Sequence, residues 1–281
     1  MSVFLNQDDL SKIIWQNGEL AAFQCSGAEE STAFLLGESD YSAQSMLRIS
    51  REEQKEHNSC FLKLPPAFMP EAAVFGAKST SDYPYSSIEN FLVVQPNDAI
   101  LQEILKSIRM VKDEPVLFKV TGAFSVLAAL IEPMKLYKAM VKSPNSLYQA
   151  LQKVNSWLTG YVISALKSGP AIVSFADPSG LCELLGKQFY TDFVANYQMA
   201  LFHSLEPFLT QSAVFICGKN SVDLQKCGFL TSVPLPCTKK NLGEELLLRA
   251  REEDFTFCGH GCMLEERVPQ KHIWKLMLNK N

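Results

Sequence analysis

Short apolar runs alternate with longer amphipathic stretches along the second half of the chain. Four runs have the length of a strand and end in turn-forming residues: 115–122 (PVLFKVTG), 171–180 (AIVSFADPSG), 212–218 (SAVFICG) and 254–259 (DFTFCG). Such runs are typical of buried strands. A fifth run, 228–236 (GFLTSVPLP), predicts a weaker strand because its prolines cannot donate to a sheet ladder.

Apolar residues at helical spacing fill the intervals between these runs. They predict helices over 146–169, 186–208, 241–254 and 269–279, with Asn241 as the N-cap of the third and a proline at the start of the fourth. The first hundred residues are less regular, with a helix near 7–17 and a charged helix near 50–57. The repeated strand–helix order calls for parallel strands joined by crossover helices.

Two architectures fit this order, an open doubly wound sheet and a closed barrel. Neither a G-x-G-x-x-G after a strand nor a G-x-x-x-x-G-K-[ST] occurs in the sequence, which favours the barrel over an open nucleotide-binding sheet. We therefore expect an α/β fold, a TIM (β/α)8-type barrel with a shortened or altered N-terminal part. The expected single domain spans 1–281, with 1–90 as an irregular N-terminal segment and 91–281 as the regular repeats.

Composition narrows the class of protein. The chain has 281 residues, of which 47% are hydrophobic and 20% charged, and this suits a globular protein with a sizeable core. A net charge of −4 gives no electrostatic footprint for nucleic acid, and no apolar segment is long enough to span a bilayer. Because no secretory signal pattern is visible, we expect a cytoplasmic protein whose eight cysteines serve as thiols, metal ligands or nucleophiles rather than in disulfides.

Polar and sulfur-containing groups stand at the carboxyl ends of four predicted strands. They are Thr121-Gly122, Asp177-Pro178, Cys217-Gly218 and the segment 258–262 (CGHGC). In a parallel architecture these ends meet at one mouth. Thiolate and imidazole are preferred zinc ligands, so the last two groups predict a metal site. Two alternatives remain open, namely that Cys217 is a small buried apolar residue and that the two cysteines of 258–262 form a redox pair.

Asp177 is the candidate catalytic residue. In SFADPSG it can serve as a general base, as a group that orients a ligand, or as the N-cap of the following helix. Lys119 places a charge inside the apolar run VLFKVTG. Its side chain either points into the barrel mouth or snorkels at a strand edge.

Several motifs occur in the order found in the uroporphyrinogen decarboxylase superfamily. They are VTGAFSVLAAL (120–130), SFADPSG (174–180), FYTDFVANY (189–197), VFICGK (214–219) and GCMLEERVPQKHI (261–273). The segment 71–86 (EAAVFGAKSTSDYPYS) also resembles that family. The sequence is most similar to the cobalamin-dependent branch, which includes the methylcobalamin:coenzyme M methyltransferases. This resemblance implies a TIM barrel, a zinc ion that binds a thiol substrate as thiolate, and a methyl group delivered by the methylcobalamin of a separate corrinoid protein.

The zinc ligands that the resemblance implies carry over unevenly. By position, the family's His-x-Cys pair falls on Phe215 and Cys217, and the third ligand falls on Cys262. Phenylalanine cannot bind a metal. Either His260 or Cys258 has taken over the missing place, or the protein is a degenerate or regulatory relative without metal. In an extended strand Cys258, His260 and Cys262 share one side, so the expected ligand set is Cys217, Cys258, His260 and Cys262.

Three functions follow from the sequence. The leading one is a zinc-dependent methyltransferase that moves a methyl group between a corrinoid protein and a thiol or similar small acceptor. The second is decarboxylation of a carboxylated ring on the same fold, with Asp177 as the key polar group. Residues 1–27 contain no arginine to grip a substrate's carboxylates, which disfavours porphyrinogen decarboxylation. The third is a non-catalytic relative that binds a corrinoid protein, an interpretation that Phe215 favours.

Overall fold

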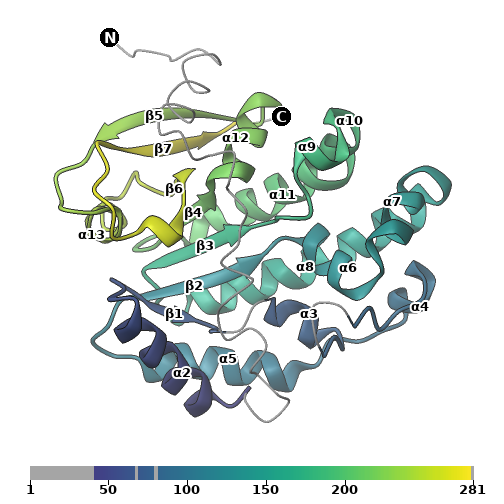
Figure 1. The fold of residues 1–281 in the computed structure, drawn as a ribbon, viewed down its shortest axis with the longest axis horizontal. Coiled ribbons are helices and arrows are strands. Elements are labelled where there is room, and N and C mark those ends of the chain that lie inside the picture. The colour runs from purple at the N-terminus through teal and green to yellow at the C-terminus, as the bar shows by residue number, and fades with distance from the viewer. Residues whose placement is uncertain (1–40, 67–68, 79–81, 280–281) are drawn as a thin grey trace.

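One seven-stranded sheet organises the protein. A computed structural model describes residues 41–66, 69–78 and 82–279, and the helix expected near 7–17 lies outside these ranges. Figure 1 shows the sheet with helices packed along it. The strands are β1 Leu62–Leu64, β2 Val116–Thr121, β3 Ile172–Ala176, β4 Ala213–Cys217, β5 Leu230–Pro236, β6 Phe257–Gly261 and β7 His272–Leu278. The five strands predicted from apolar runs are β2 to β6, so the expected α/β class is confirmed.

The strands lie in the order β1-β2-β3-β4-β6-β7-β5. The first five in this order run parallel, whereas β7 pairs antiparallel with both β6 and β5. The mostly parallel sheet is the one a barrel of this type requires. Its two edges are β1 and β5, and no pairing joins them, so the strands that the structure describes do not close the ring.

Helices connect the parallel strands and cover the sheet. Their bounds are α2 Ala43–Glu56, α3 Pro70–Val74, α4 Ile88–Leu92, α5 Asp98–Met110, α6 Ala123–Leu130, α7 Pro133–Lys142, α8 Pro144–Leu166, α9 Cys182–Leu185, α10 Lys187–Tyr190, α11 Asn196–Leu205, α12 Gly218–Lys226 and α13 Leu242–Arg249. A π-helical turn, η4 Thr191–Ala195, joins α10 to α11, and short 3-10 turns lie at η5 Glu206–Phe208 and η6 Met263–Glu265. The helices expected over 146–169, 186–208 and 241–254 are confirmed, and Asn241 caps the last by accepting the N–H of Glu244.

The helix expected over 269–279 is wrong. This segment forms strand β7, which pairs with all seven residues of β5 and also with β6. Pro269 suggested a helix start, but the segment HIWKLML also reads as a strand of β-branched, aromatic and apolar residues. The open edges of β5 and β6 decide the outcome, because they supply a hydrogen-bonding partner on each side. Such long-range pairing is not visible in local apolar spacing.

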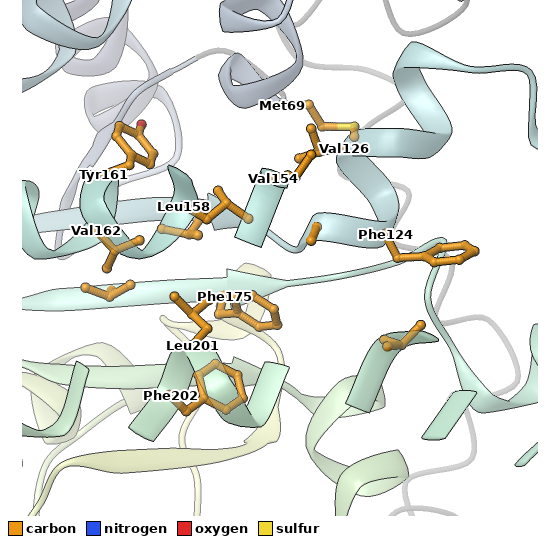
Figure 2. Packing of buried hydrophobic residues seen from close by; sticks show 14 of the residues in the cluster. Met69, Phe124, Val126, Val154, Leu158, Tyr161, Val162, Phe175, Leu201 and Phe202 are labelled. Carbon is orange, nitrogen blue, oxygen red and sulfur yellow. The ribbon is translucent and has the colours of Figure 1, made fainter. Parts of the chain in front are cut away.

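Two apolar clusters cover opposite faces of the sheet. On the larger, which we call the large-core face, Phe175 of β3 lies between α8 and α11, as Figure 2 shows. Its ring contacts Phe202 edge-on with centroids 4.9 Å apart. On the other, the small-core face, lie Leu117, Ile172, Ala213, Phe215 and Cys258, with Leu242 and Leu246 of α13 packed against them. None of the helices within the described ranges combines the length and apolarity that a membrane span needs.

Candidate functional site

The carboxyl ends of β2, β3, β4 and β6 meet along one edge of the sheet, as the sequence predicted. The N–H of Gly122, directly after β2, donates to the carbonyl of Ala176 at the end of β3. Cys217 at the end of β4 is the register partner of Gly261 at the end of β6. A Cβ on Gly218 would lie 2.9 Å from the carbonyl oxygen of Gly261, so glycine permits this close approach. We call this region the strand-end edge.

Asp177 lies buried on the strand-end edge, where its carboxylate accepts hydrogen bonds from two helices. Its Oδ1 accepts the backbone N–H of Ser125 at 2.8 Å and the Ser125 hydroxyl at 2.5 Å. Its Oδ2 accepts Nε2 of Gln198 at 3.2 Å. Burial raises the pKa of Asp177, while these donors oppose the shift. The backbone of Asp177 is held as well, since Asn220 accepts its N–H and donates to its carbonyl.

This arrangement gives Asp177 a capping role for a helix distant in sequence. Ser125 is the third residue of α6, and the residue at that helix's N-cap position, Gly122, has no side chain to act as acceptor. A Cβ on Gly122 would lie 2.3 Å from Oδ2 of Asp177, so the carboxylate occupies the space of the missing cap. A carboxylate there also meets the positive end of the helix dipole. The catalytic role of Asp177 stays a prediction.

Phe215 lies in a row of register partners that crosses the small-core face. The row runs from Lys119 through Ser174 and Phe215 to Cys258. Phe215 is 1% exposed, and its ring lies 3.5 Å from where a Cβ on Gly261 would be. Cys258 is fully buried in the same cluster, and its thiol donates to the carbonyl of Val214 at 3.6 Å. Burial raises the pKa of Cys258, so its sulfur stays a protonated thiol.

A register shift turns His260 away from Cys258. Two steps along β4, from Phe215 to Cys217, face three steps along β6, from Cys258 to Gly261. The extra residue of β6 is accommodated at His260, whose backbone φ of 57° lies in the left-handed region. The expectation that Cys258 and His260 share one side of a regular strand is therefore wrong. Cys258 lies on the small-core face, whereas the ring of His260 contacts Trp274 of the large-core cluster.

Both ring nitrogens of His260 are engaged by helix α12. Nε2 lies 2.8 Å from Oε1 of Gln225, and Nδ1 lies 3.0 Å from the hydroxyl of Ser221. The same hydroxyl accepts the backbone N–H of His260 at 2.9 Å. These partners fit a neutral ring that donates from Nε2 and accepts at Nδ1. Burial lowers the pKa of His260 to about 4, so the ring stays neutral near pH 7.

The predicted metal ligands therefore do not come together as one set. Cys217 and Cys262 stay near each other on the strand-end edge, where Gly261 pairs with Cys217. Cys258 and His260 are directed to opposite faces and bind protein partners. Across the ranges that the structure describes, no three His, Cys, Asp or Glu side chains are grouped closely enough to hold a metal ion. A zinc site needs three or four such ligands, so the residues as placed do not fit the zinc that the resemblance implies.

A second polar group at the strand-end edge was missed by sequence reasoning. Glu71 of α3 is 1% exposed, and its Oε1 accepts the N–H of Thr121 at the end of β2 at 3.0 Å. Within the described residues, its Oε2 has no hydrogen-bond partner. Burial raises the pKa of Glu71 to about 7. The sequence held one signal for Glu71. It is the first residue of the segment 71–86, which resembles the family.

Lys119 is close enough to Glu71 for each charge to affect the pKa of the other group. Its ammonium donates to the carbonyl of Pro66 at 2.8 Å. Burial lowers the pKa of Lys119 to about 8, while the charge of Glu53 and, to a smaller extent, that of Glu71 partly offset the shift. The charge on an apolar strand thus faces the small-core face rather than snorkelling to solvent. Glu71 and Lys119 are two titratable groups whose pKa values are drawn toward neutrality, which is a common property of catalytic sites.

Comparison with known proteins agrees with this description of an α/β protein with a mostly parallel sheet. The family model "Uroporphyrinogen decarboxylase (URO-D)" matches residues 76–232, more than half of the chain. The chain belongs to the URO-D family.

Among solved structures, a methyltransferase from Methanosarcina mazei is similar to this protein. The TM-score is 0.55 and the sequence identity 19%, over 68% of this chain. The chain spans 62% of the length of that methyltransferase. At this identity the likeness concerns the fold alone. No curated protein matches the chain.

Proposed function

We propose that this URO-D family protein binds a methyl-carrying corrinoid protein and does not activate a thiol through zinc. The family membership and the likeness to a methyltransferase fold support a role in methyl-transfer chemistry. The observation that supports the absence of zinc chemistry is that Gln225 and Ser221 occupy both ring nitrogens of His260. A histidine with neither nitrogen available cannot replace the ligand that Phe215 lacks.

Zinc, when bound in a site of the family's type, lowers the pKa of a thiol so that it reacts as thiolate. That chemistry needs three protein ligands and one open position for the substrate sulfur. Here Phe215, at a position where the family has a ligand, packs in an apolar cluster together with Cys258. We therefore assign no step to zinc. Within this proposal the strand-end edge receives the corrinoid protein, because ligands of parallel barrels bind at the carboxyl ends of the strands.

The test uses two probes, free methylcobalamin and a corrinoid protein isolated from the source cells and loaded with methylcobalamin. Sedimentation of the full chain with the loaded corrinoid protein should show a complex. Demethylation of the cobalamin by added thiols, followed by its visible absorbance, should run no faster with the chain than without it, whether or not zinc is added. Absence of a complex would contradict the proposal that the protein binds a corrinoid protein. Zinc-dependent demethylation that is lost in both Cys217→Ser and Cys262→Ser would restore the zinc methyltransferase hypothesis.

Decarboxylation of a carboxylated ring is a second candidate, which Glu71 favours. A carboxyl group with a pKa of about 7 can give a proton to the carbanion that remains when carbon dioxide leaves. The nearby ammonium of Lys119 can neutralise a substrate carboxylate. The test is release of carbon dioxide from uroporphyrinogen by wild type and Glu71→Gln. Loss of general acid catalysis should slow turnover by roughly 100-fold or more, and equal turnover would exclude this role for Glu71.

A further inference from the structure

Two cysteines other than those of the strand-end edge lie where α9 approaches α12. Cys182, the first residue of α9, and Cys227, at the C-cap of α12, are both hydrogen-bonded to Asp223, and the side chain of Cys182 lies close enough to affect the pKa of Cys227. Both are partly exposed, and both pack against the rim of the large core. A small oxidant in solvent can therefore reach them, while the surrounding apolar residues hold their backbones in place.

Asp223 fixes the relative position of the two cysteines. Its Oδ2 accepts the backbone N–H of Cys182 at 2.8 Å, which ties the start of α9 to α12. Its carbonyl accepts the N–H of Cys227 at 3.0 Å, as in a regular helical turn. Residues four apart on a helix lie on the same face, so Asp223 and Cys227 both face α9. The backbones of Cys182 and Cys227 are thus held on facing elements, both next to Asp223.

We propose that Cys182 and Cys227 form a reversible disulfide that responds to hydroperoxides. In the overall step one hydrogen peroxide and two thiols give one disulfide and two waters. The O–O bond and both S–H bonds break and the S–S bond forms. Each sulfur loses one electron, and the peroxide gains both. A dithiol reductant reverses the step by thiol–disulfide exchange and is itself oxidised to a disulfide.

The protonation of Cys227 shapes the kinetics of this step. Burial, and after it the neighbouring Cys182, raise the pKa of Cys227 to about 11. Cys227 therefore stays a thiol at neutral pH, and it reacts as the second partner, with a sulfenic acid already formed on Cys182. Because thiolates are the nucleophiles, we expect disulfide formation to be faster at pH 9 than at pH 7.

The position of the pair suggests what the disulfide does. Helix α9 follows the turn Asp177–Gly180 after β3, and α12 follows directly after Cys217 of β4. A bond between Cys182 and Cys227 would tether the segments that leave two neighbouring strands at the strand-end edge. Oxidation should therefore stiffen this edge and raise the melting temperature by about 5 to 10 °C, the range for a disulfide that closes a loop of this order of length.

The experiment treats the full chain with one equivalent of hydrogen peroxide, blocks remaining thiols with N-ethylmaleimide and maps peptides by mass spectrometry. We expect a peptide that joins Cys182 to Cys227, its disappearance after dithiothreitol, and its absence in Cys182→Ser and Cys227→Ser. Cys60→Ser and Cys237→Ser are matched controls that should keep the linked peptide. Oxidation of wild type to sulfinic acids at separate cysteines, or random linkage among all thiols, would overturn the proposal. Because the decisive readout is made on wild type and needs no corrinoid protein, it is independent of the proposed function.

Discussion

Nε2 of His260 lies 2.8 Å from Oε1 of Gln225, and this contact fixes the histidine against α12. The sequence FCGHGC places an imidazole two residues from each cysteine, at a spacing that suits a metal site. The register shift opposite β4 instead directs the ring into the large-core face. An imidazole that looks like a ligand in the sequence is a partly buried structural group that links β6 to α12.

His260 should make the protein sensitive to acid. Burial holds its folded-state pKa at about 4, below the ordinary value of 6.5. A depressed pKa contributes stability that is fully present above pH 6.5 and is lost as the pH falls toward 4. The shift corresponds to roughly 3 kcal/mol. The free energy of unfolding of wild type, measured with urea from pH 7 to pH 4, should fall more steeply than that of His260→Gln.

The exposed His203 provides the matched control. Its Nδ1 lies 3.4 Å from Oε2 of Glu206, and its side chain is 37% exposed. His203→Gln should therefore follow the wild-type pH dependence closely. If His260→Gln and wild type showed parallel slopes between pH 7 and pH 4, the ring of His260 would not be held in the neutral form by the folded protein.

Glu71 should have the opposite pH dependence. Burial raises its folded-state pKa from 4.5 to about 7, so the carboxyl is protonated in the folded protein at mildly acid pH. A raised pKa contributes stability that is present below pH 4.5 and is lost as the pH rises through 7. The loss is of the order of 3 kcal/mol. Glu71→Gln, which cannot ionise, should remove this loss, so the variant gains stability relative to wild type between pH 4.5 and pH 8.

Glu103 offers a control for this measurement. Its carboxylate is partly exposed and accepts the N–H of Ala43, and this hydrogen bond lowers the pKa of Glu103. Glu103→Gln should not gain stability as the pH rises. A Glu71→Gln variant whose stability tracks that of wild type at every pH would mean that Glu71 is ionised and solvated in the folded protein.

Asp177→Asn should destabilise the protein whether or not Asp177 also takes part in catalysis. An amide at this position leaves the N–H and hydroxyl of Ser125 with a weaker acceptor in a buried place. We expect a loss of roughly 2 to 4 kcal/mol in the free energy of unfolding. Asp192→Asn, which affects only a surface contact with Gln188, should change stability by less than about 0.5 kcal/mol. Equal stability of the two variants would contradict the capping role.

The local signals in the sequence were enough for the repeated strands and most helices. Runs such as VLFKVTG and VFICG have strand length and end in turn residues, and they form β2 and β4 as expected. Whether residues 269–279 form a helix or a strand depends on partners far along the chain. They form β7 because β5 and β6 both offer an edge for pairing. Long-range pairing of this kind leaves little trace in a single sequence.

The convergence of four strand ends could also be predicted, because it follows from parallel strands alone. The orientation of individual side chains could not. One extra residue in β6 reverses the face of His260 relative to Cys258. The acceptor role of Asp177 depends on a glycine at the start of α6, and the neighbourhood of Glu71 and Lys119 brings together segments 48 positions apart. Each of these features needs the register and the packing of the sheet.

Phe215→His should increase the zinc affinity of the protein, because it restores an imidazole at the position where the family has a histidine ligand. The new imidazole would stand two residues from Cys217 on the same strand face and beside Gly261, which precedes Cys262. Three ligand groups of the type zinc prefers would then lie at one place. The variant should bind more zinc than wild type in a competition with a chromophoric chelator. Because Phe215 is buried, the variant should also be less stable by roughly 1 to 3 kcal/mol, which urea unfolding can check.

The most direct test of the central claim is the zinc content of wild type purified without chelator and then equilibrated with excess zinc. Since Phe215 cannot ligate and His260 is held by Gln225 and Ser221, we expect less than about 0.1 zinc ion per chain after removal of free metal. About one zinc ion per chain, lost in both Cys217→Ser and Cys262→Ser, would contradict the claim and show that the strand-end edge rearranges to form a metal site.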